Sequence, residues 1–349
     1  MSFNYFPLIK TRDAELRCMR SLSSETLKRI LPIYELTKSR KTKIAPEGNI
    51  YKRMEEIRSI QKDNPFILDL SLNPKYINSK IEQLMSPEYG FKEWQEFLNF
   101  FPELNIIPMV HLYEDSEDSL KETLQFVRDM SIKKDLAIRL PYNLPQGNYT
   151  YYLDPITKVL QNDHKLIVIL DADYIRNEAK NNIKKVADNF IFAIKEIRKL
   201  SKIKYIIMVG TTFPRNPAHE GKNDEMGEFN IYEEEIYRCV REKVDVKYGD
   251  YVSINTEQIE IKGGGFVPRI DIALENSFFY KRYRQKDGGY ERCAKKILQD
   301  ERYNNLFCWA DEEIKKASLD NATGLSPAFW ISVRMVYYIQ SRINLRNDY

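Results

Sequence analysis

Histidine and cysteine are scarce in this sequence, and long hydrophobic runs are absent. The chain of 349 residues contains 3 histidines and 4 cysteines, and no Cys-x-x-Cys spacing indicates a zinc site. No apolar run approaches the roughly 20 residues that a membrane-spanning helix needs. The first ten residues also lack the basic and apolar regions of a secretory signal. We therefore expect a cytoplasmic protein with reduced cysteines and no membrane partner.

An excess of one charge is also missing. Lys and Arg number 54 against 51 Asp and Glu, which leaves a net charge of +3. This balance argues against a uniformly cationic surface that coats nucleic acid. Hydrophobic residues make up 43% and aromatic residues 12% of the chain, more than a disordered protein contains. The length allows two domains, or one barrel with an appendage.

Eight short apolar runs of strand length recur along the first 255 residues. They occupy residues 6–10, 30–36, 66–71, 106–112, 136–140, 165–171, 205–211 and 248–254. Stretches with helical apolar spacing separate them, and near-continuous apolar strands are typical of a parallel sheet covered on both faces. The pattern predicts an α/β fold, a (β/α)8 TIM-barrel-like domain. The alternative, an open doubly wound sheet, would be favoured by a glycine-rich turn after the first strand, which this sequence lacks.

The pattern changes after residue 255. Three glycines at 263–265 interrupt regular structure, residues 266–284 are rich in strand-forming residues, and helical spacing follows. We divide the chain into a barrel at 1–255 and a C-terminal cap at 256–349, made of a β-hairpin and helices. The last helix is apolar around most of its circumference, so we expect it to be buried against the barrel or against a second subunit of a homo-oligomer.

Charged side chains interrupt or follow the predicted strands. In barrel enzymes the functional residues lie at the carboxyl ends of the strands and in the loops that follow. Residues at these positions are Lys10, Arg12, Glu35, Asp69, His111, Arg139, Asp171, Asp173 and Asp250. Unpaired burial of a charge against the helices would be costly, so we expect these residues at the barrel mouth. There they form either a functional site or an ion network that holds the barrel closed.

The residue types at the mouth indicate a phosphate-containing ligand, such as a nucleotide or nucleic acid. The candidate catalytic residues are His111, Glu35, Asp69 and Asp171, and the carboxylates could also hold Mg²⁺ or Mn²⁺. Candidate phosphate-binding residues are Lys10, Arg12, Arg139, Thr211, Thr212 and Arg334. An enzyme of this kind would hydrolyse phosphoester bonds as a nuclease or phosphodiesterase does. Arg334 in the last helix needs an anionic partner, and a carboxylate of the mouth is one candidate.

Two further segments each allow two interpretations. Residues 213–221 form a long polar segment after the seventh strand, which is either a lid or a solvated insertion. Residues 278–284 interleave aromatic and basic side chains, an arrangement that suits stacking on nucleobases. The same pattern fits a strand with one aromatic face turned inward and one basic face in water, and the balanced net charge favours this second interpretation.

Short motifs are spread over nearly the whole chain. They are YFPLIK at 5–10, AEL at 14–16, LPIYE at 31–35, GDY at 249–251, PRI at 268–270 and the segment 334–340. Together they resemble the Beta protein family of phages, phage satellites and bacterial defence islands. In place of a His-Leu pair expected near the end, this chain has Tyr337 and Tyr338.

The resemblance to the Beta protein family implies a role in anti-phage defence or superinfection exclusion. It also implies a partner toxin or effector encoded in the same locus. It brings no established catalytic residues, so the site residues rest on the strand positions alone. The alternative to an enzyme is a sensor or partner-binding protein without catalytic activity.

Overall fold

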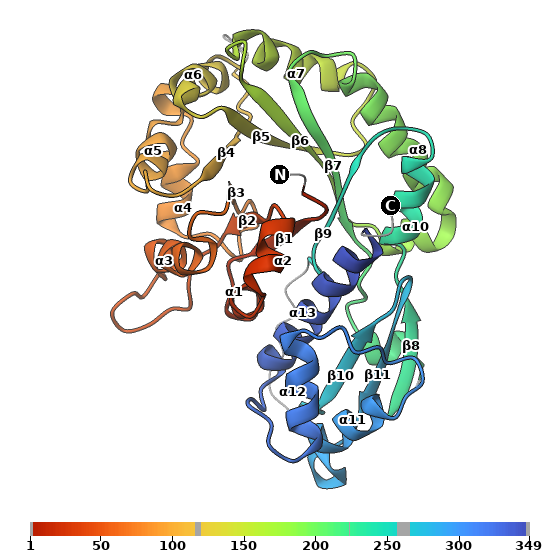
Figure 1. Ribbon diagram of the computed structural model, residues 1–349. Helices are drawn as coiled ribbons and strands as arrows, with labels where there is room; N and C mark the ends of the chain where they lie inside the picture. Colours follow the sequence, from red (N-terminus) through yellow and green to blue (C-terminus); the bar gives the residue numbers. More distant parts are fainter. Residues whose placement is uncertain (1–2, 116–119, 223, 257–265, 347–349) are drawn as a thin grey trace.

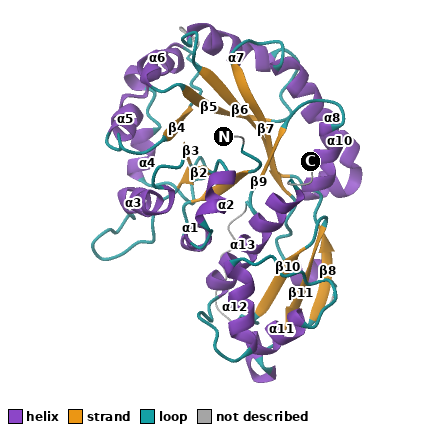
Figure 2. Ribbon diagram, in the orientation of Figure 1, coloured by secondary structure: helices purple, strands orange, loops and turns teal. Residues whose placement is uncertain are grey.

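Eight parallel strands close into a barrel with helices around its outside (Figure 1). The computed structural model describes residues 3–115, 120–222, 224–256 and 266–346. The strand order around the barrel is β1, β2, β3, β4, β5, β6, β7 and β9. A separate three-stranded sheet and the C-terminal helices lie to one side of the barrel (Figure 2). The predicted (β/α)8 fold is confirmed.

Each of the eight predicted apolar runs overlaps one barrel strand. The strands are β1 (Phe6–Lys10), β2 (Ile33–Leu36), β3 (Phe66–Leu70), β4 (Ile106–Val110), β5 (Asp135–Pro141), β6 (Lys165–Tyr174), β7 (Ile203–Thr211) and β9 (Lys247–Asp250). The barrel closes where β1 pairs with β9, with Phe6 opposite Gly249. A Cβ atom at residue 249 would lie 2.5 Å from the carbonyl oxygen of Phe6. Glycine is therefore required for this closure.

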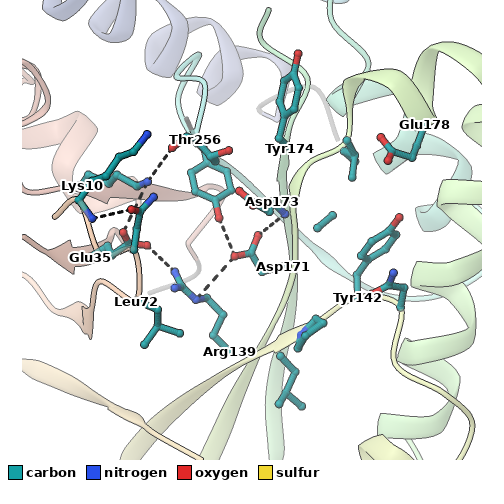
Figure 3. Close-up of a pocket in the computed structure, with 18 residues that line it drawn as sticks. Lys10, Glu35, Leu72, Arg139, Tyr142, Asp171, Asp173, Tyr174, Glu178 and Thr256 are labelled. Atoms are coloured by element: carbon teal, nitrogen blue, oxygen red, sulfur yellow. Dashed lines mark hydrogen bonds and ion pairs between the residues drawn. The ribbon is translucent and has the colours of Figure 1, made fainter. Parts of the chain in front are cut away.

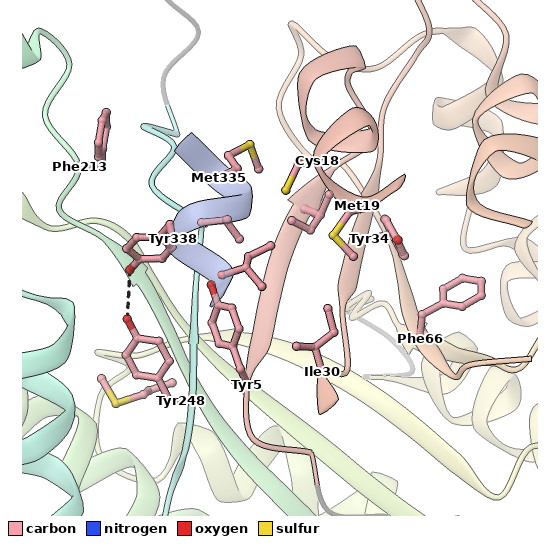
Figure 4. Packing of buried hydrophobic residues seen from close by; sticks show 14 of the residues in the cluster. Tyr5, Cys18, Met19, Ile30, Tyr34, Phe66, Phe213, Tyr248, Met335 and Tyr338 are labelled. Carbon is pink, nitrogen blue, oxygen red and sulfur yellow. Dashed lines mark hydrogen bonds between the residues drawn. The ribbon is translucent and has the colours of Figure 1, made fainter. Parts of the chain in front are cut away.

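The outer helices bury apolar faces against the strands. They are α1 (Asp13–Arg20), α2 (Ser24–Arg29), α3 (Ile50–Gln61), α4 (Ser79–Leu84), α5 (Glu88–Asn99), α6 (Lys121–Asp129), α7 (Asn148–Val159), α8 (Arg176–Ile197) and α10 (Glu233–Arg241). Ser23, Asn49 and Asn78 begin three of them by accepting backbone N–H groups of the first turn. The apolar layer between strands and helices includes Tyr34 and Phe66 (Figure 4).

A second, smaller apolar cluster fills the inside of the barrel. Its members include Leu8, Ile33, Ile67, Ala137 and Ile169. Side chains alternate between the two faces of a strand, so the residue two positions after each of these also points inward. Those residues are Lys10, Glu35, Asp69, Arg139 and Asp171. Alternation therefore places one charged side chain from each of five strands above the apolar layer.

The second sheet combines segments from both sides of residue 255. Its strands are β8 (Met226–Asn230), β10 (Arg269–Ala273) and β11 (Ser277–Arg282), with β11 in the centre. The remaining helices are α9 (Pro217–Glu220), α11 (Gly289–Leu298), α12 (Trp309–Ser318) and α13 (Pro327–Leu345), with short 3-10 turns η1 (Met130–Ile132) and η2 (Gln285–Asp287). The polar segment at 213–221 thus leads into a strand that pairs with β11. The division into two domains stays a prediction.

The aromatic and basic segment at 278–284 lies mostly in the central strand β11. Phe278 and Tyr280 are completely buried. Lys281 Nζ pairs with Asp300 at 2.8 Å, and Arg284 pairs with Asp224 at 2.9 Å. The aromatic side chains are buried as the second interpretation expected, but Lys281 is buried as well at 8% exposure, and of these two basic residues only Arg284 is exposed.

Helix α13 packs against α1 and β10 of the same chain. Its Arg334 Nη1 lies 3.0 Å from Asp271 Oδ2 in β10. The expectation that Arg334 pairs with a carboxylate of the barrel mouth is therefore wrong, because α13 lies between the barrel and the second sheet. Among the described residues, no helix is long and apolar enough to cross a membrane.

Candidate ligand-binding site at the barrel mouth

A cavity of about 760 Å³ lies where the barrel strands end. Lys10, Glu35, Arg139 and Asp171 line it, each from a different strand (Figure 3). Sites for small molecules commonly measure about 300–1,000 Å³. The cavity therefore has the size of a small-molecule site and is lined by predicted site residues.

Arg139 occupies the centre of the cluster. Its Nη1 lies 3.0 Å from Glu35 Oε2 and 3.1 Å from Asp69 Oδ2, and its Nε lies 3.8 Å from Asp171 Oδ2. Lys10 Nζ lies 3.8 Å from the other oxygen of Glu35. The structure thus brings five of the predicted site residues together. Asp69 is 3% exposed and lies outside the cavity lining, so it supports Arg139 from below.

The surroundings push the pKa values of these carboxyl groups apart. Burial raises the pKa of Asp69 to about 6. Burial also acts to raise the pKa of Glu35, but Arg139 and Lys10 outweigh it and the pKa is lowered. Two carboxyl groups on one guanidinium with divergent pKa values can hold a proton and an anion side by side. Burial lowers the pKa of Lys10.

An irregularity at the end of β6 fixes Asp171. The register of β6 and β7 shifts between Asp171 and Tyr174, and Asp173 has a positive φ of 51°. The N–H of Asp173 donates to Asp171 Oδ1 at 2.8 Å, and the hydroxyl of Tyr251 donates to Asp171 Oδ2 at 2.7 Å. Bulges and left-handed residues at strand ends recur at functional sites. Here each oxygen of the Asp171 carboxylate is held by one donor, Oδ1 by the Asp173 N–H and Oδ2 by the Tyr251 hydroxyl.

Several lining residues are absent from the sequence-based prediction. They are Lys75, Tyr142, Tyr174, Glu178 and Tyr251. Tyr251 directly follows β9, next to Asp250, the residue that the sequence-based prediction placed there. Asp250, predicted at the rim, instead turns outward. Lys75 and Glu178 come from a loop and a helix, where strand alternation gives no signal.

His111 does not join the cluster. Its ring centroid lies 6.0 Å from that of Phe91 and 5.8 Å from that of Trp94, both on α5. Strand β4 ends at Val110, so the alternation that points its neighbours inward does not extend to residue 111. Burial, with a smaller effect of Arg139, lowers the pKa of His111 to about 4. It is a neutral side chain packed beside the outer helices.

The two predicted phosphate-binding threonines make structural contacts away from the cavity. Thr211 Oγ1 donates to the carbonyl oxygen of Ile254 at 2.9 Å. Thr212 Oγ1 donates to Glu233 Oε2 at 2.7 Å. Both threonines are buried, and neither lines the mouth cavity. Their hydroxyls position the loop after β7.

Arg12 and Arg334 also lie away from the mouth cavity. Arg12 pairs with Glu15 and donates from Nη1 to the Tyr76 hydroxyl at 3.2 Å. Arg12 and Arg334 instead line a second cavity, between the barrel and the second sheet. The structure thus separates the six predicted phosphate-binding residues into two at the mouth, two at the second cavity and two with structural contacts.

The comparison with known proteins decides the family. The sequence model of the Beta protein family matches residues 5–344. This chain belongs to the Beta protein family. It is similar to Protein beta of Enterobacteria phage P4, with 29% identity over 353 residues, which covers 99% of this chain and 94% of that protein. No solved structure matches the chain.

Three of the six short motifs of this Beta protein contribute a residue to the mouth cavity. Lys10, Glu35 and Tyr251 fall within the motifs at 5–10, 31–35 and 249–251, and all three line the cavity. Residue Tyr338, in the segment where a His-Leu pair was expected, donates to Asp250 at 2.7 Å. The predicted resemblance is confirmed.

The mouth of this Beta protein does not fit a metal ion held by its own side chains. Within the described ranges, no three His, Cys, Asp or Glu residues are arranged to hold one. The Arg139 guanidinium lies between Glu35, Asp69 and Asp171, where a divalent cation would need its ligands. We therefore derive no step through Mg²⁺ or Mn²⁺.

The lowered pKa of His111 predicts that the stability of the fold depends on pH. Its pKa is lowered from 6.5 to about 4, so the unfolded chain takes up the proton first, and stability is lost as the pH falls through this window. Between about pH 7 and pH 4.5, the free energy of unfolding of the wild type should fall by about 2 kcal/mol more than that of His111→Phe. Urea unfolding at several pH values measures this difference. Asp69 titrates in the opposite sense but is common to both proteins. Equal losses in both would contradict the buried, neutral state of His111.

Proposed function

We propose that this Beta protein acts in anti-phage defence or superinfection exclusion as a ligand-binding barrel. Its mouth binds a nucleotide, either free as a nucleoside monophosphate or at the end of a nucleic acid. One observation carries the proposal: Arg139 is held between three carboxylates at the base of a cavity of about 760 Å³. A largely buried guanidinium fixed in this way is already oriented before the ligand arrives.

The cations of the mouth supply the phosphate contacts. Lys10, Lys75 and Arg139 line the cavity. Among the described residues, the contacts of Arg139 use Nη1 and Nε, so we assign Nη2 to the phosphate. Arginine binds phosphate through paired N–H donors, and each such charge-assisted bond is stronger than a neutral one.

The anions of the mouth limit the ligand to one with few charges. Among the described lining residues, three cations face the four carboxylates of Glu35, Asp171, Asp173 and Glu178. Carboxylates accept hydrogen bonds from ribose hydroxyls and base amino groups, whereas they repel additional phosphates. The balance favours a single phosphate over a triphosphate. Tyr142 and Tyr174 provide aromatic surface for the base.

Binding is better supported than hydrolysis. His111 packs beside α5, and Asp69, whose pKa is raised to about 6, lies beneath Arg139. Two of the four candidate catalytic residues are therefore away from the cavity, whereas Glu35 and Asp171 line it. This arrangement favours a sensor, which would act with a toxin or effector of the same locus, over a nuclease or phosphodiesterase. Phosphoester hydrolysis is a separate activity to be tested.

Calorimetric titration with AMP, GMP, CMP, UMP, the matching nucleosides and the triphosphates tests the proposal. We expect at least one monophosphate to bind about tenfold or more tightly than its nucleoside and its triphosphate. Lys75→Met, an exposed change, should weaken that binding about fivefold through the lost phosphate contact. Asp171→Asn should weaken it about tenfold, because an NH2 donor replaces one of the two acceptor oxygens. The same titration with added Mg²⁺ or Mn²⁺, followed for phosphate release, measures hydrolysis.

Asp163→Asn provides the matched control. Asp163 precedes the amino end of β6, and Asp171 lies near its carboxyl end, so the same chemical change is made at opposite ends of one strand. The control should bind like the wild type. The proposal fails if no mononucleotide binds, or if Asp163→Asn and Asp171→Asn weaken binding equally. Phage protection by the Asp171→Asn variant then shows whether the ligand matters in the cell.

A further inference from the structure

A second cavity of about 770 Å³ separates the barrel from the second sheet and α13. Its described lining includes four arginines and one carboxylate, namely Arg12, Arg215, Arg269, Arg334 and Asp271. We call this cavity the barrel–cap groove. Unlike the mouth, where carboxylates outnumber the cations, its lining carries an excess of positive charge.

Pairing reduces this excess but does not remove it, since Arg12 pairs with Glu15 and the other carboxylate, Asp271, is shared by two arginines. Arg269 Nε lies 2.7 Å and Arg334 Nη1 lies 3.0 Å from the two oxygens of Asp271, so two guanidinium groups share one carboxylate. Arg334 is 5% exposed and is held further by the Ser253 carbonyl at 3.1 Å. Arg215 is on the exposed rim. The groove is therefore a fixed positive surface that suits an anion.

Aromatic side chains accompany the arginines. Trp330 stacks on Tyr290 with ring centroids 4.7 Å apart, and the Arg334 guanidinium lies 4.3 Å from the centroid of Phe213. Phe266 lines the groove with 48% of its surface exposed. An exposed ring beside guanidinium groups suits the stacking of nucleobases, which is worth about 1–3 kcal/mol per base. An acidic peptide would use the arginines but not the ring.

The groove and the mouth share their borders. Lys10 lines the mouth and Arg12, two residues later, lines the groove; Thr256 lines the mouth and Asn255 lines the groove. Lys10 Nζ contacts the Thr256 carbonyl at 3.4 Å. The contact between these two segments is therefore the boundary between the cavities. A ligand longer than one nucleotide that crosses this boundary reaches both.

We propose that the barrel–cap groove binds the backbone of a single-stranded nucleic acid whose terminal nucleotide enters the mouth. The inference rests on the proposed function of the mouth for the terminal nucleotide, whereas the groove contributes the remaining affinity. One phosphodiester carries one negative charge, which matches the preference of the mouth for a single phosphate. The following phosphates meet the arginines of the groove, and the Phe266 ring stacks on a base.

Fluorescence anisotropy with labelled oligo(dT) and oligo(U) of about ten nucleotides tests the groove. Arg215→Glu should weaken binding about tenfold or more, and Phe266→Ala about fivefold, and the wild-type affinity should fall as KCl rises. Arg128→Glu on α6 makes the same charge change at another exposed site and should stay within about twofold of the wild type. DNA and RNA probes show which sugar the site prefers.

The outcomes separate the groove from the mouth. If the Arg215→Glu variant no longer binds the oligonucleotide but still binds the mononucleotide, the proposed role of the groove is supported. If neither Arg215→Glu nor Phe266→Ala weakens oligonucleotide binding, or if polyglutamate displaces the oligonucleotide as well as unlabelled strand does, the inference is overturned. If the protein binds the oligonucleotide through Arg215 but binds no mononucleotide, the groove is supported and the proposed function of the mouth is refuted. Thermal unfolding verifies that each exposed change leaves the fold intact.

Discussion

Replacing Arg139 with methionine is expected to lower the free energy of unfolding at about pH 8 by about 3–5 kcal/mol. The side chains of Glu35, Asp69 and Asp171 are 6%, 4% and 15% exposed. Without the guanidinium, these three carboxylates lose their shared partner while remaining largely buried. Removing one member of a buried ion cluster costs more than the cluster contributes, because the remaining charges stay desolvated. Urea unfolding monitored by circular dichroism measures the loss.

The loss caused by Arg139→Met should depend on pH. In the variant, burial and mutual repulsion raise the pKa values of the folded carboxyl groups above their unfolded values, so stability is regained below the unfolded pKa and lost as the pH rises. The difference from the wild type should therefore shrink from about pH 8 to pH 5. Arg128→Met, at an exposed position of α6, should change stability by less than about 0.5 kcal/mol at both pH values. A loss below about 1 kcal/mol at pH 8, or one independent of pH, would show that Arg139 does not neutralise the cluster.

The second large effect is expected at the strand pair that closes the barrel. Asp250 accepts hydrogen bonds from the hydroxyls of Tyr5, Tyr248 and Tyr338 and from the N–H of Val252. The three tyrosines come from the residue before β1, from β9 and from α13, and all three are buried (Figure 4). Asp250→Leu leaves the donors without their acceptor, and we expect it to destabilise the fold by about 3–5 kcal/mol. Hydrogen exchange should accelerate first in β1 and β9.

A graded control accompanies the Asp250 prediction. Tyr338→Phe removes one of the three hydroxyls and leaves two, so it should cost only about 1 kcal/mol. The Tyr248 and Tyr338 hydroxyls lie 3.3 Å apart, so Tyr248 keeps its own bond to Asp250 in this variant. If Asp250→Leu costs no more than Tyr338→Phe, the carboxylate does not secure the barrel closure. Thermal unfolding of both variants in one buffer makes the comparison.

The site was predictable where strand alternation determines side-chain direction. Lys10, Glu35 and Asp69 occupy matching positions in three neighbouring strands, with Lys10 opposite Glu35 and Glu35 opposite Asp69. Glu35 and Asp69 have hydrophobic neighbours on both sides and Lys10 follows an apolar run, so the strands and their inward face can be recognised without coordinates. His111 was placed wrongly within this scheme because β4 ends one residue before it. A strand boundary is decided by pairing with neighbouring strands, which the sequence does not display.

The second cavity could not be predicted from the sequence, because it is formed by contacts between distant segments. Arg12 and Arg334 are 322 positions apart in numbering yet line one groove, because α13 returns to pack against α1 and β10. Strand β8 likewise leaves the barrel region of the sequence to pair with β11. Such long-range contacts depend on how whole surfaces pack together. Each residue involved could pair equally well with many other residues of the chain, so its own sequence position does not identify its partner.

The sequence by itself determined the eight strands, their parallel arrangement and the inward direction of five charged side chains. Apolar periodicity sets these features, and periodicity is a local property of the chain. The tertiary structure alone decided that Arg139 lies between three carboxylates, that Asp250 faces outward to three tyrosines, and that Arg12 and Arg334 share a groove. These features depend on how strands register and helices pack, since charge and hydrogen-bond partners are chosen by proximity in space and not by position along the chain.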